Sequence, residues 1–159
     1  MKTAQFKNQK AFTLIELLVV IGILAVLLAI TLIAINPAKQ FAQANDTKRR
    51  SDVNAILNAI NQYAADNKGV LPTGITATAA VIGDGVGQVN ICGDLVTKYL
   101  AALPVDPTDG TDGTTVGNAS DCSAGYNTAY EVSQSATDNR VTITAPGVET
   151  VGETISVTR

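Results

Sequence analysis

The stretch FTLIELLVVIGILAVLLAITLIAI, from Phe12 to Ile35, decides how this chain is organised. Glu16 is its only charged residue, and the residues from Leu17 to Ile35 carry no charge at all. A helix over those residues would be about 28 Å long at a rise of about 1.5 Å per residue, close to the hydrocarbon thickness of a bilayer. The stretch therefore predicts a membrane-spanning helix.

The carboxylate of Glu16 is the unusual feature of this helix, because an acid inside an apolar membrane segment costs about 2.5–3.5 kcal/mol on insertion scales. Hydropathy alone favours an ordinary single-pass anchor or an uncleaved secretory signal, and neither of these needs the acid. A cationic partner would offset the cost. Cleavage between Ala11 and Phe12 would create an amine four residues before Glu16, and this amine could pair with the carboxylate of a neighbouring copy.

The residues from Lys10 to Val20, KAFTLIELLVV, resemble the class III signal of type IV prepilins and of type II secretion pseudopilins. In that family a membrane peptidase cuts before the phenylalanine and methylates the new amine. The resemblance implies that Ala11 and Phe12 are the scissile pair, that Phe12 is N-methylated, and that Glu16 registers the subunits during assembly. The residue before the cut is most often glycine in the family, so Ala11 is a departure, and slower processing is expected.

Composition allows one modest soluble domain besides the membrane helix. Hydrophobic residues make up 46% of the 159, but the apolar stretch holds many of them, and aromatic residues make up only 4%. Removal of residues 1–11 takes away three of the 11 basic residues, and the remaining eight face 14 acidic residues, a net charge of −6. An acidic exterior does not attract nucleic acid, so direct nucleic-acid binding is not expected.

These patterns predict four parts: a leader over residues 1–11, a hydrophobic helix over 12–36, an amphipathic helix over 37–68 and a small α+β head over 69–159. The basic leader favours retention on the cytoplasmic side, so the precursor is expected in the cytoplasmic membrane as a single pass with its N-terminus inside. Pro37 predicts a kink or break after the hydrophobic helix, and Gly22 and Thr31 are further candidate soft points.

The amphipathic helix has apolar residues that recur mostly at intervals of three and four, namely Phe41, Ala44, Val53, Ile56, Leu57, Ile60, Tyr63 and Ala64. This stripe is expected to pack on a small sheet. The polar residues, Asp46 included, are assigned to the opposite face, and the cluster from Lys48 to Arg50 is expected to be solvated or to face another subunit. The helix is expected to end at DNKG, residues 66–69, and the segment DNKGVLP resembles the close of the long pilin helix.

The C-terminal part is predicted to combine a short helix with strands. Residues 73–87 are expected to form a loop, and DLVTKYLAAL, residues 94–103, has the spacing of a helix. Alternating residues predict three strands, around 126–132, 141–145 and 155–157, with a hairpin turn at Asp138 and Asn139. The predicted fold class is therefore α+β and pilin-like, with a long N-terminal helix packed on a small antiparallel C-terminal sheet.

Cys92 and Cys122 are the only cysteines, and they favour a disulfide over a metal site, because a metal would need more ligands and the chain has no histidine. Two unpaired buried thiols are the alternative. Asp106, Asp109 and Asp112 stand three residues apart among glycines, a pattern that can gather around calcium, although a polar turn explains such a string more often. Because major pseudopilins often hold calcium in a comparable loop, calcium stays a candidate, and no other cofactor is expected.

The sequence shows no catalytic pattern, so an enzyme is not expected. The residues and the resemblance indicate a structural subunit of a type IV pilus, a homopolymer on the cell surface. The expected partners are the prepilin peptidase and methyltransferase, the pilus assembly platform and minor pilins. One alternative is a major pseudopilin of a type II secretion system. An alternative of another class is a membrane-tethered binding module that does not polymerise.

Overall fold

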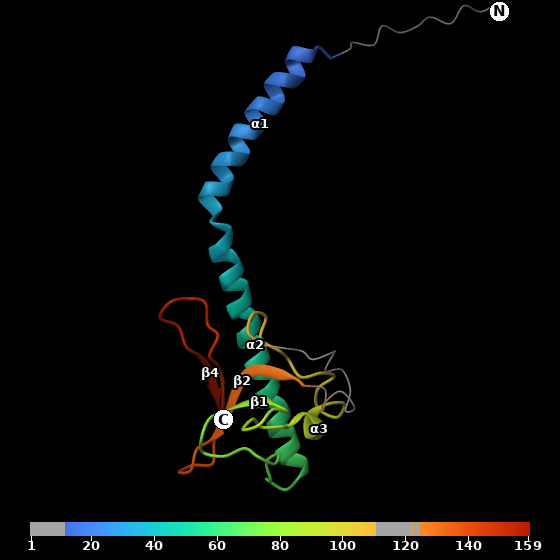
Figure 1. Cartoon of the computed structure of the whole chain (residues 1–159), viewed down its shortest axis with the longest axis vertical. Helices are drawn as coiled ribbons and strands as arrows, with labels where there is room; N and C mark the ends of the chain where they lie inside the picture. Colours follow the sequence, from blue (N-terminus) through green and yellow to red (C-terminus); the bar gives the residue numbers. More distant parts are fainter. Residues whose placement is uncertain (1–11, 111–121, 123–124) are drawn as a thin grey trace, which may run out of the picture. The chain divides into compact units, whose positions relative to one another are not determined.

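The structure is a computed structural model of the chain, and it describes residues 12–110, 122 and 125–159. The chain divides into two compact units, one that ends at Gln40 and one that runs from Phe41 to Arg159. Each unit is described by itself. Figure 1 shows the elements of both units along the chain.

The first unit is built on α1, Leu14–Ile35, the helix drawn in blue in Figure 1. Not one residue of α1 is buried. Within the described part of the chain, α1 is the one helix that is long and apolar enough to cross a membrane. It runs without interruption through Gly22 and Thr31. The predicted hydrophobic helix is therefore present, and its surface is apolar on all sides.

The break predicted at Pro37 is also present. α1 ends at Ile35, Asn36 adopts a left-handed backbone conformation with φ of 45°, and α2, Pro37–Asp66, begins at the next residue. Proline suits the first position of a helix because the N–H that it lacks would have no partner inside the helix. The carbonyl and the side-chain oxygen of Asn36 both accept from the amide of Lys39, at 3.1 and 3.4 Å, so the chain starts a new helix here.

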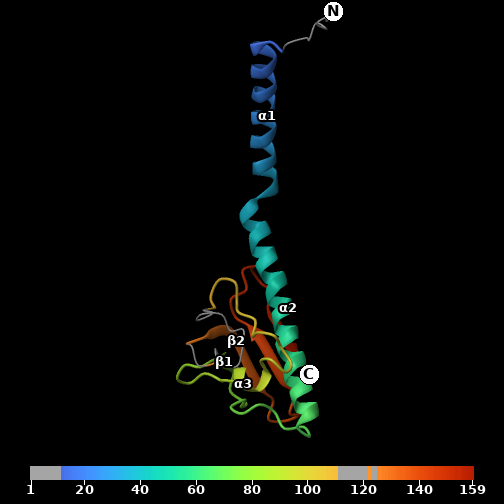
Figure 2. The same cartoon turned by 90° about the vertical axis from the view of Figure 1, so that its right-hand side faces the viewer.

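The second unit, called the head from here on, combines α2 from Phe41 onward with a four-stranded antiparallel sheet. The strands are β1 (Ala80–Gly83), β2 (Asn127–Gln134), β3 (Val141–Ala145) and β4 (Ile155–Thr158), and each is paired with the next in sequence. Figure 2 shows α2 lying against this sheet. The predicted α+β arrangement is confirmed.

The core of the head lies between α2 and the sheet. Residues from α2, the sheet and the segments between them are fully buried in it: Val53, Ile56, Ile60, Ile82, Ile91, Leu95, Tyr130, Val132 and Ile143. The predicted stripe of α2 is thus confirmed from Val53 onward. Phe41 and Ala44, which were predicted to belong to it, are exposed instead.

Two predicted turns are present. The hairpin between β2 and β3 passes through Asp138 and Asn139, and Asn139 is left-handed with φ of 58°. α2 ends at Asp66, where Gly69 takes φ of 88° and its amide donates to the carbonyl of Ala64 at 2.7 Å. A glycine or asparagine adopts these left-handed positions at low cost, and this is why these residues mark turns.

The prediction of a loop over residues 73–87 is wrong at β1. Ala80 pairs with Val132 and Val81 with Glu131, and the register shifts before Gly83. A strand of four residues is too short to show an alternating pattern, so periodicity alone does not reveal it. Its formation depends on β2, which lies far away in the sequence and offers an edge for pairing.

The predicted helix over residues 94–103 is shorter and earlier than expected. The structure has α3 at Cys92–Leu95 only, after which Val96 is extended and Thr97 takes a left-handed conformation with φ of 72°. Leu95, Val96 and Leu103 are nevertheless buried, as their spacing predicted. Helical spacing identified the buried residues correctly, but tight turns rather than a helix bring them to the core.

Replacement of Thr97 by glycine is expected to stabilise the head by about 1 kcal/mol. A left-handed conformation costs a non-glycine residue about 1–3 kcal/mol, whereas glycine adopts it freely but loses about 0.5–1 kcal/mol through its greater freedom in the unfolded chain. Thr97 is exposed, so its side chain gives up little packing. Urea unfolding of the full chain in detergent, followed by the near-UV signal of its tyrosines, measures the change.

The neighbouring variant Lys98→Gly is the matched control. Lys98 is also exposed, but its φ is not in the left-handed region. Glycine there should lower stability, since only the unfolded-state effect remains. If Thr97→Gly destabilised the chain as much as Lys98→Gly, the expectation for Thr97 would be wrong.

Candidate functional site

Glu16 lies in the first turn of α1 and forms a capping box with Thr13. The Thr13 side-chain oxygen accepts from the Glu16 amide at 3.3 Å, and Glu16 Oε2 accepts from the Thr13 amide at 2.8 Å and from the Thr13 hydroxyl at 2.7 Å. This role of Thr13 was not predicted, although Thr-x-x-Glu before an apolar run is the sequence signature of a capping box. The box holds the carboxylate at the very start of the helix, where the helix dipole favours a negative charge.

The predicted processing site adjoins this box. Phe12 directly precedes Thr13, and the residue is 81% exposed. Ala11 lies outside the described residues. Cleavage between these two residues and methylation of Phe12 stay predictions.

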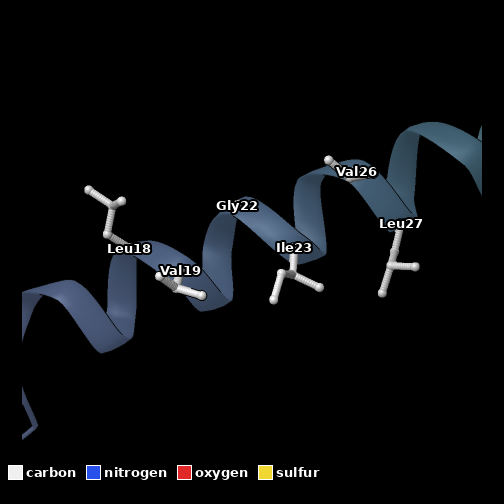
Figure 3. A pocket seen from close by; sticks show the side chains of 6 residues that line it. All are labelled: Leu18, Val19, Gly22, Ile23, Val26 and Leu27. Atoms are coloured by element: carbon white, nitrogen blue, oxygen red, sulfur yellow. The ribbon is translucent and has the colours of Figure 1, made fainter.

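The remainder of α1 offers an uninterrupted apolar surface. A shallow hollow centres on Gly22 and is lined by Leu18, Val19, Ile23, Val26 and Leu27, as Figure 3 shows. The hollow exists because glycine has no Cβ, and no side chain other than those of its two chain neighbours lies within 4 Å of the position that a Cβ would occupy. Only a bilayer or other apolar helices can keep such a surface from water.

In the head, Arg49 is the centre of a buried ion cluster, and for this residue the prediction of a solvated or intersubunit face is wrong. Its side chain is fully buried. Nε and Nη2 donate to the two carboxylate oxygens of Asp106, at 2.7 and 3.0 Å, and Nη1 donates to Asp46 at 2.9 Å and to Glu149 at 3.1 Å. Nη2 also donates to the hydroxyl of Thr108 at 2.7 Å. All five N–H groups of the guanidinium are therefore used.

The cluster joins α2 to two loops of the head. Asp46 also accepts from the amides of Glu149 and Thr150 at 3.0 and 2.9 Å, in the loop of residues 146–154 between β3 and β4. Asp106 belongs to the segment of residues 103–110 that follows α3 and its turn. We call Arg49 with Asp46, Asp106 and Glu149 the arginine clasp, because it ties both loops to one helix.

A signal in the sequence could have revealed the clasp. Asp46 and Arg49 precede Val53 and Ile56 at intervals of three, four and three residues, so they continue the buried stripe of α2 toward its N-terminus. Their charge had instead favoured the solvent-facing side of the helix in the prediction. The two flanking cations are exposed as expected: Lys48 pairs with Asp52 at 2.9 Å, and Arg50 pairs with Glu153.

The electrostatics of the clasp stabilise its charged forms. Burial raises the pKa of Asp46, but hydrogen bonds from Thr150, Glu149 and Arg49 outweigh burial and lower that pKa to about 2. Burial likewise opposes the hydrogen bonds from Arg49 and Thr108 at Asp106, whose pKa also falls to about 2. The hydrogen bonds that Arg49 donates to Asp106 and Asp46 raise the pKa of Arg49 despite its burial. In the described residues no buried side-chain nitrogen or oxygen lacks a hydrogen-bond partner.

Acid is expected to destabilise the head within a defined pH window. The folded-state pKa values of Asp46 and Asp106 are about 2. An unfolded aspartate has a pKa of about 3.9, so the clasp stabilises the fold fully above about pH 5 and loses this contribution as the pH falls from about 4 to about 2. The loss should amount to a few kcal/mol, on the order of 2 kcal/mol for each carboxylate, and urea unfolding of the full chain at a series of pH values measures it.

Asp46→Asn provides the control for this titration. The variant lacks one of the two carboxyl groups whose pKa is lowered in the folded state. Its free energy of unfolding should therefore fall less steeply over the same pH window. A wild-type stability that stays constant between about pH 4 and about pH 2 would contradict the expected linkage.

The three calcium candidates occupy different environments. Asp106 is buried in the arginine clasp, Asp109 is exposed, and Asp112 lies outside the described residues. Among the described residues, no three Asp, Glu, Cys or His side chains form a group that could hold a metal ion. The trio is thus not assembled within the part of the chain that the structure describes.

The predicted disulfide joins Cys92, the first residue of α3, to Cys122, with a Cα–Cα distance of 5.4 Å. Both cysteines are buried, and the alternative of two unpaired thiols does not apply. The Asn90 side chain supports the bridge. It accepts from the Cys92 amide at 3.3 Å and from the Tyr126 hydroxyl at 2.9 Å, and it donates to the Cys122 carbonyl at 3.4 Å. Burial raises the pKa of Tyr126 to about 12, so its hydroxyl stays a donor at neutral pH.

Comparisons with known proteins agree with this architecture. Residues 6–32 match the family model of the prokaryotic N-terminal methylation motif. The chain is 32% identical over 103 residues to type II secretion system core protein G of Pseudomonas aeruginosa, in an alignment that covers 65% of this chain and 70% of that protein. No solved structure matches the chain.

An apolar helix with a capped acid at its start, followed by an α+β head, defines a pilin-like filament subunit with a membrane anchor. The N-terminal motif and the similarity to core protein G show that the chain belongs to the family of type IV pilins and type II secretion pseudopilins. This family consists of structural subunits that a prepilin peptidase processes and that polymerise, and its members are not enzymes.

Proposed function

We propose that this protein is a structural subunit of a type IV pilus. It is made as a prepilin in the cytoplasmic membrane, cut between Ala11 and Phe12, methylated on the Phe12 amine and polymerised through α1 into a filament on the cell surface. The observation that carries the proposal is Glu16, a single carboxylate at the start of a helix that is otherwise uncharged and exposed on all sides.

The role of Glu16 follows from the cost of a charge in an apolar medium. The capping box with Thr13 satisfies part of the hydrogen-bonding capacity of the carboxylate but leaves its charge unbalanced. The amine of Phe12 in a neighbouring processed copy carries the opposite charge. Because both ions are expensive in hydrocarbon, their pairing is favoured when two helices pack side by side at the right height. The pair therefore fixes the axial register between subunits.

The apolar surface of α1 supplies the second contribution. As subunits leave the bilayer, neighbouring α1 helices replace lipid in keeping these side chains from water. The contact between the start of one helix and the amine of the next copy is head-to-tail, and head-to-tail contacts whose rotation does not close generate open fibres. One sequence is therefore sufficient to build the filament.

A type II secretion pseudopilus is the second candidate, and the similarity to core protein G of Pseudomonas aeruginosa favours it. Both filaments use the same N-terminal chemistry. They differ in where the polymer accumulates, since a pilus extends from the cell surface and a pseudopilus is a short periplasmic fibre.

Intact mass and N-terminal sequencing of protein sheared from the cell surface test the proposal. A chain that starts at methylated Phe12, is abundant in this fraction and is lighter by two hydrogens than its reduced form would support a processed, disulfide-containing pilus subunit. The same processed chain found only in the periplasm and membrane would favour the pseudopilus. A full-length chain that starts at Met1 and stays in the membrane would overturn both candidates.

Glu16→Val is expected to abolish most assembly. Loss of a pairing worth more than about 1.4 kcal/mol lowers an assembly constant by a factor of about ten or more, so sheared filaments should decrease at least about tenfold while the chain stays in the membrane. Ile15→Val changes the same turn without a change in charge and should assemble normally. A membrane-tethered binding module would show no loss with either variant, because valine at position 16 only improves insertion.

A further inference from the structure

We propose that Arg49 serves as a built-in cation of the head. It ties the loops of Asp106 and Glu149 to α2, so that the head closes without calcium. The proposal concerns the fold of the head and does not rest on the proposed function. It replaces the hypothesis of a calcium site in the loop that contains Asp106. Its basis is the hydrogen bonds that the carboxylates of Asp106 and Asp46 already accept.

The carboxylate of Asp106 is already surrounded by donors from the chain, four at Oδ1 and one at Oδ2. Its Oδ1 accepts from Arg49 Nη2 at 3.0 Å, from the amide and hydroxyl of Thr108 at 2.9 and 3.1 Å, and from the amide of Asp109 at 3.1 Å. Its Oδ2 accepts from Arg49 Nε at 2.7 Å, and the side chain is fully buried. A carboxylate offers about four lone-pair positions, and five donors already surround this one.

Asp46 is engaged in the same way. Its Oδ1 accepts from Arg49 and from the Glu149 amide, and its Oδ2 accepts from the amide and hydroxyl of Thr150. The clasp thus brings together three acidic residues around one buried positive charge. Carboxylates from separate loops that converge on a cation are what a calcium site also requires, but here the cation is part of the chain.

A calcium ion at Asp106 would also meet direct repulsion. Arg49 Nε and Nη2 both lie within 3.0 Å of the Asp106 oxygens, so an ion bound to the same carboxylate would stand close to a buried guanidinium. Like charges at such separations repel strongly where water is excluded. Of the other two candidates, Asp109 is exposed and Asp112 lies outside the described residues.

Urea unfolding of the full chain in detergent, with EGTA or with millimolar calcium chloride, tests the proposal. We expect the same urea midpoint in both conditions, because a ligand that does not bind the folded state adds no stability. A higher midpoint in calcium than in EGTA would overturn the proposal, since it would show that the ion holds the folded head.

Variants identify Arg49 as the residue responsible. Arg49→Met should lower the midpoint by the same amount in EGTA and in calcium, whereas Arg50→Met, at the exposed neighbouring position, should leave it nearly unchanged. Arg49→Lys keeps the charge but cannot form the bidentate contact with Asp106. It should give an intermediate urea midpoint that is still insensitive to calcium. Recovery of the wild-type midpoint of Arg49→Met or Arg49→Lys by calcium would contradict the proposal.

Discussion

Arg49→Met should lower the free energy of unfolding of the head by about 3–5 kcal/mol. The substitution leaves the negative charges of Asp46 and Asp106 buried without the cation that balances them. Removal of one partner of a buried ion pair is strongly destabilising because the remaining charge is uncompensated. Methionine keeps much of the side-chain volume, so loss of packing contributes little. The measurement is urea unfolding of the full chain in detergent at neutral pH, with Arg50→Met as the exposed control.

A second substitution separates the electrostatic effect from any other. If the cost arises from uncompensated charge, Asp106→Asn added to Arg49→Met should recover part of the loss, and the two single changes should not be additive. An Arg49→Met chain that loses less than about 1 kcal/mol would mean that water solvates the two carboxylates, and the buried clasp would then be a wrong description.

Removal of the disulfide is the other change with a large expected effect. Cys92 and Cys122 are 30 residues apart in the sequence, and closing a loop of this size contributes roughly 3–4 kcal/mol in the chain-entropy model. The double variant Cys92→Ala with Cys122→Ala should therefore unfold at a much lower urea concentration than the oxidised chain. Incubation of the wild-type chain with a reductant should lower its midpoint by a similar amount.

The double variant also serves as the control for the reductant, because it has no bridge to reduce and its midpoint should not respond. Equal midpoints for oxidised and reduced wild-type chains would show that the bridge does not constrain the unfolded state. Asn90 would then hold this region of the head by itself through its bonds to Cys92, Cys122 and Tyr126.

The sequence predicted those parts of the fold that depend on neighbouring residues. The apolar run defines α1, the alternation at residues 141–145 defines β3, and Pro37 marks the break between two helices, because each of these signals is local. β1 was missed since it depends on pairing with β2, nearly 50 residues later. The helix over 94–103 was predicted too long because burial at helical spacing does not require a helix, and Thr97 turns the chain instead.

The candidate site shows the same division. Glu16 stands out in the sequence because its immediate surroundings are apolar, and its capping partner Thr13 is three residues away. Arg49 looked like one of three surface cations because its main partner, Asp106, is 57 residues distant in the sequence. The charge of an arginine by itself predicts exposure. Burial of Arg49 becomes favourable only because the fold brings several carboxylates around it.

The interruption at Asn36 and Pro37 also has a consequence for cooperativity. A helix propagates order only while its backbone hydrogen bonds continue, and here Asn36 leaves helical geometry and Pro37 brings no N–H. The backbone hydrogen bonds of α2 therefore do not continue into α1, so unfolding that begins in the head does not propagate along the helix into α1. α1 can stay folded in hydrocarbon while the head opens and closes, so amide exchange in α1 and amide exchange in the head should follow two independent unfolding equilibria.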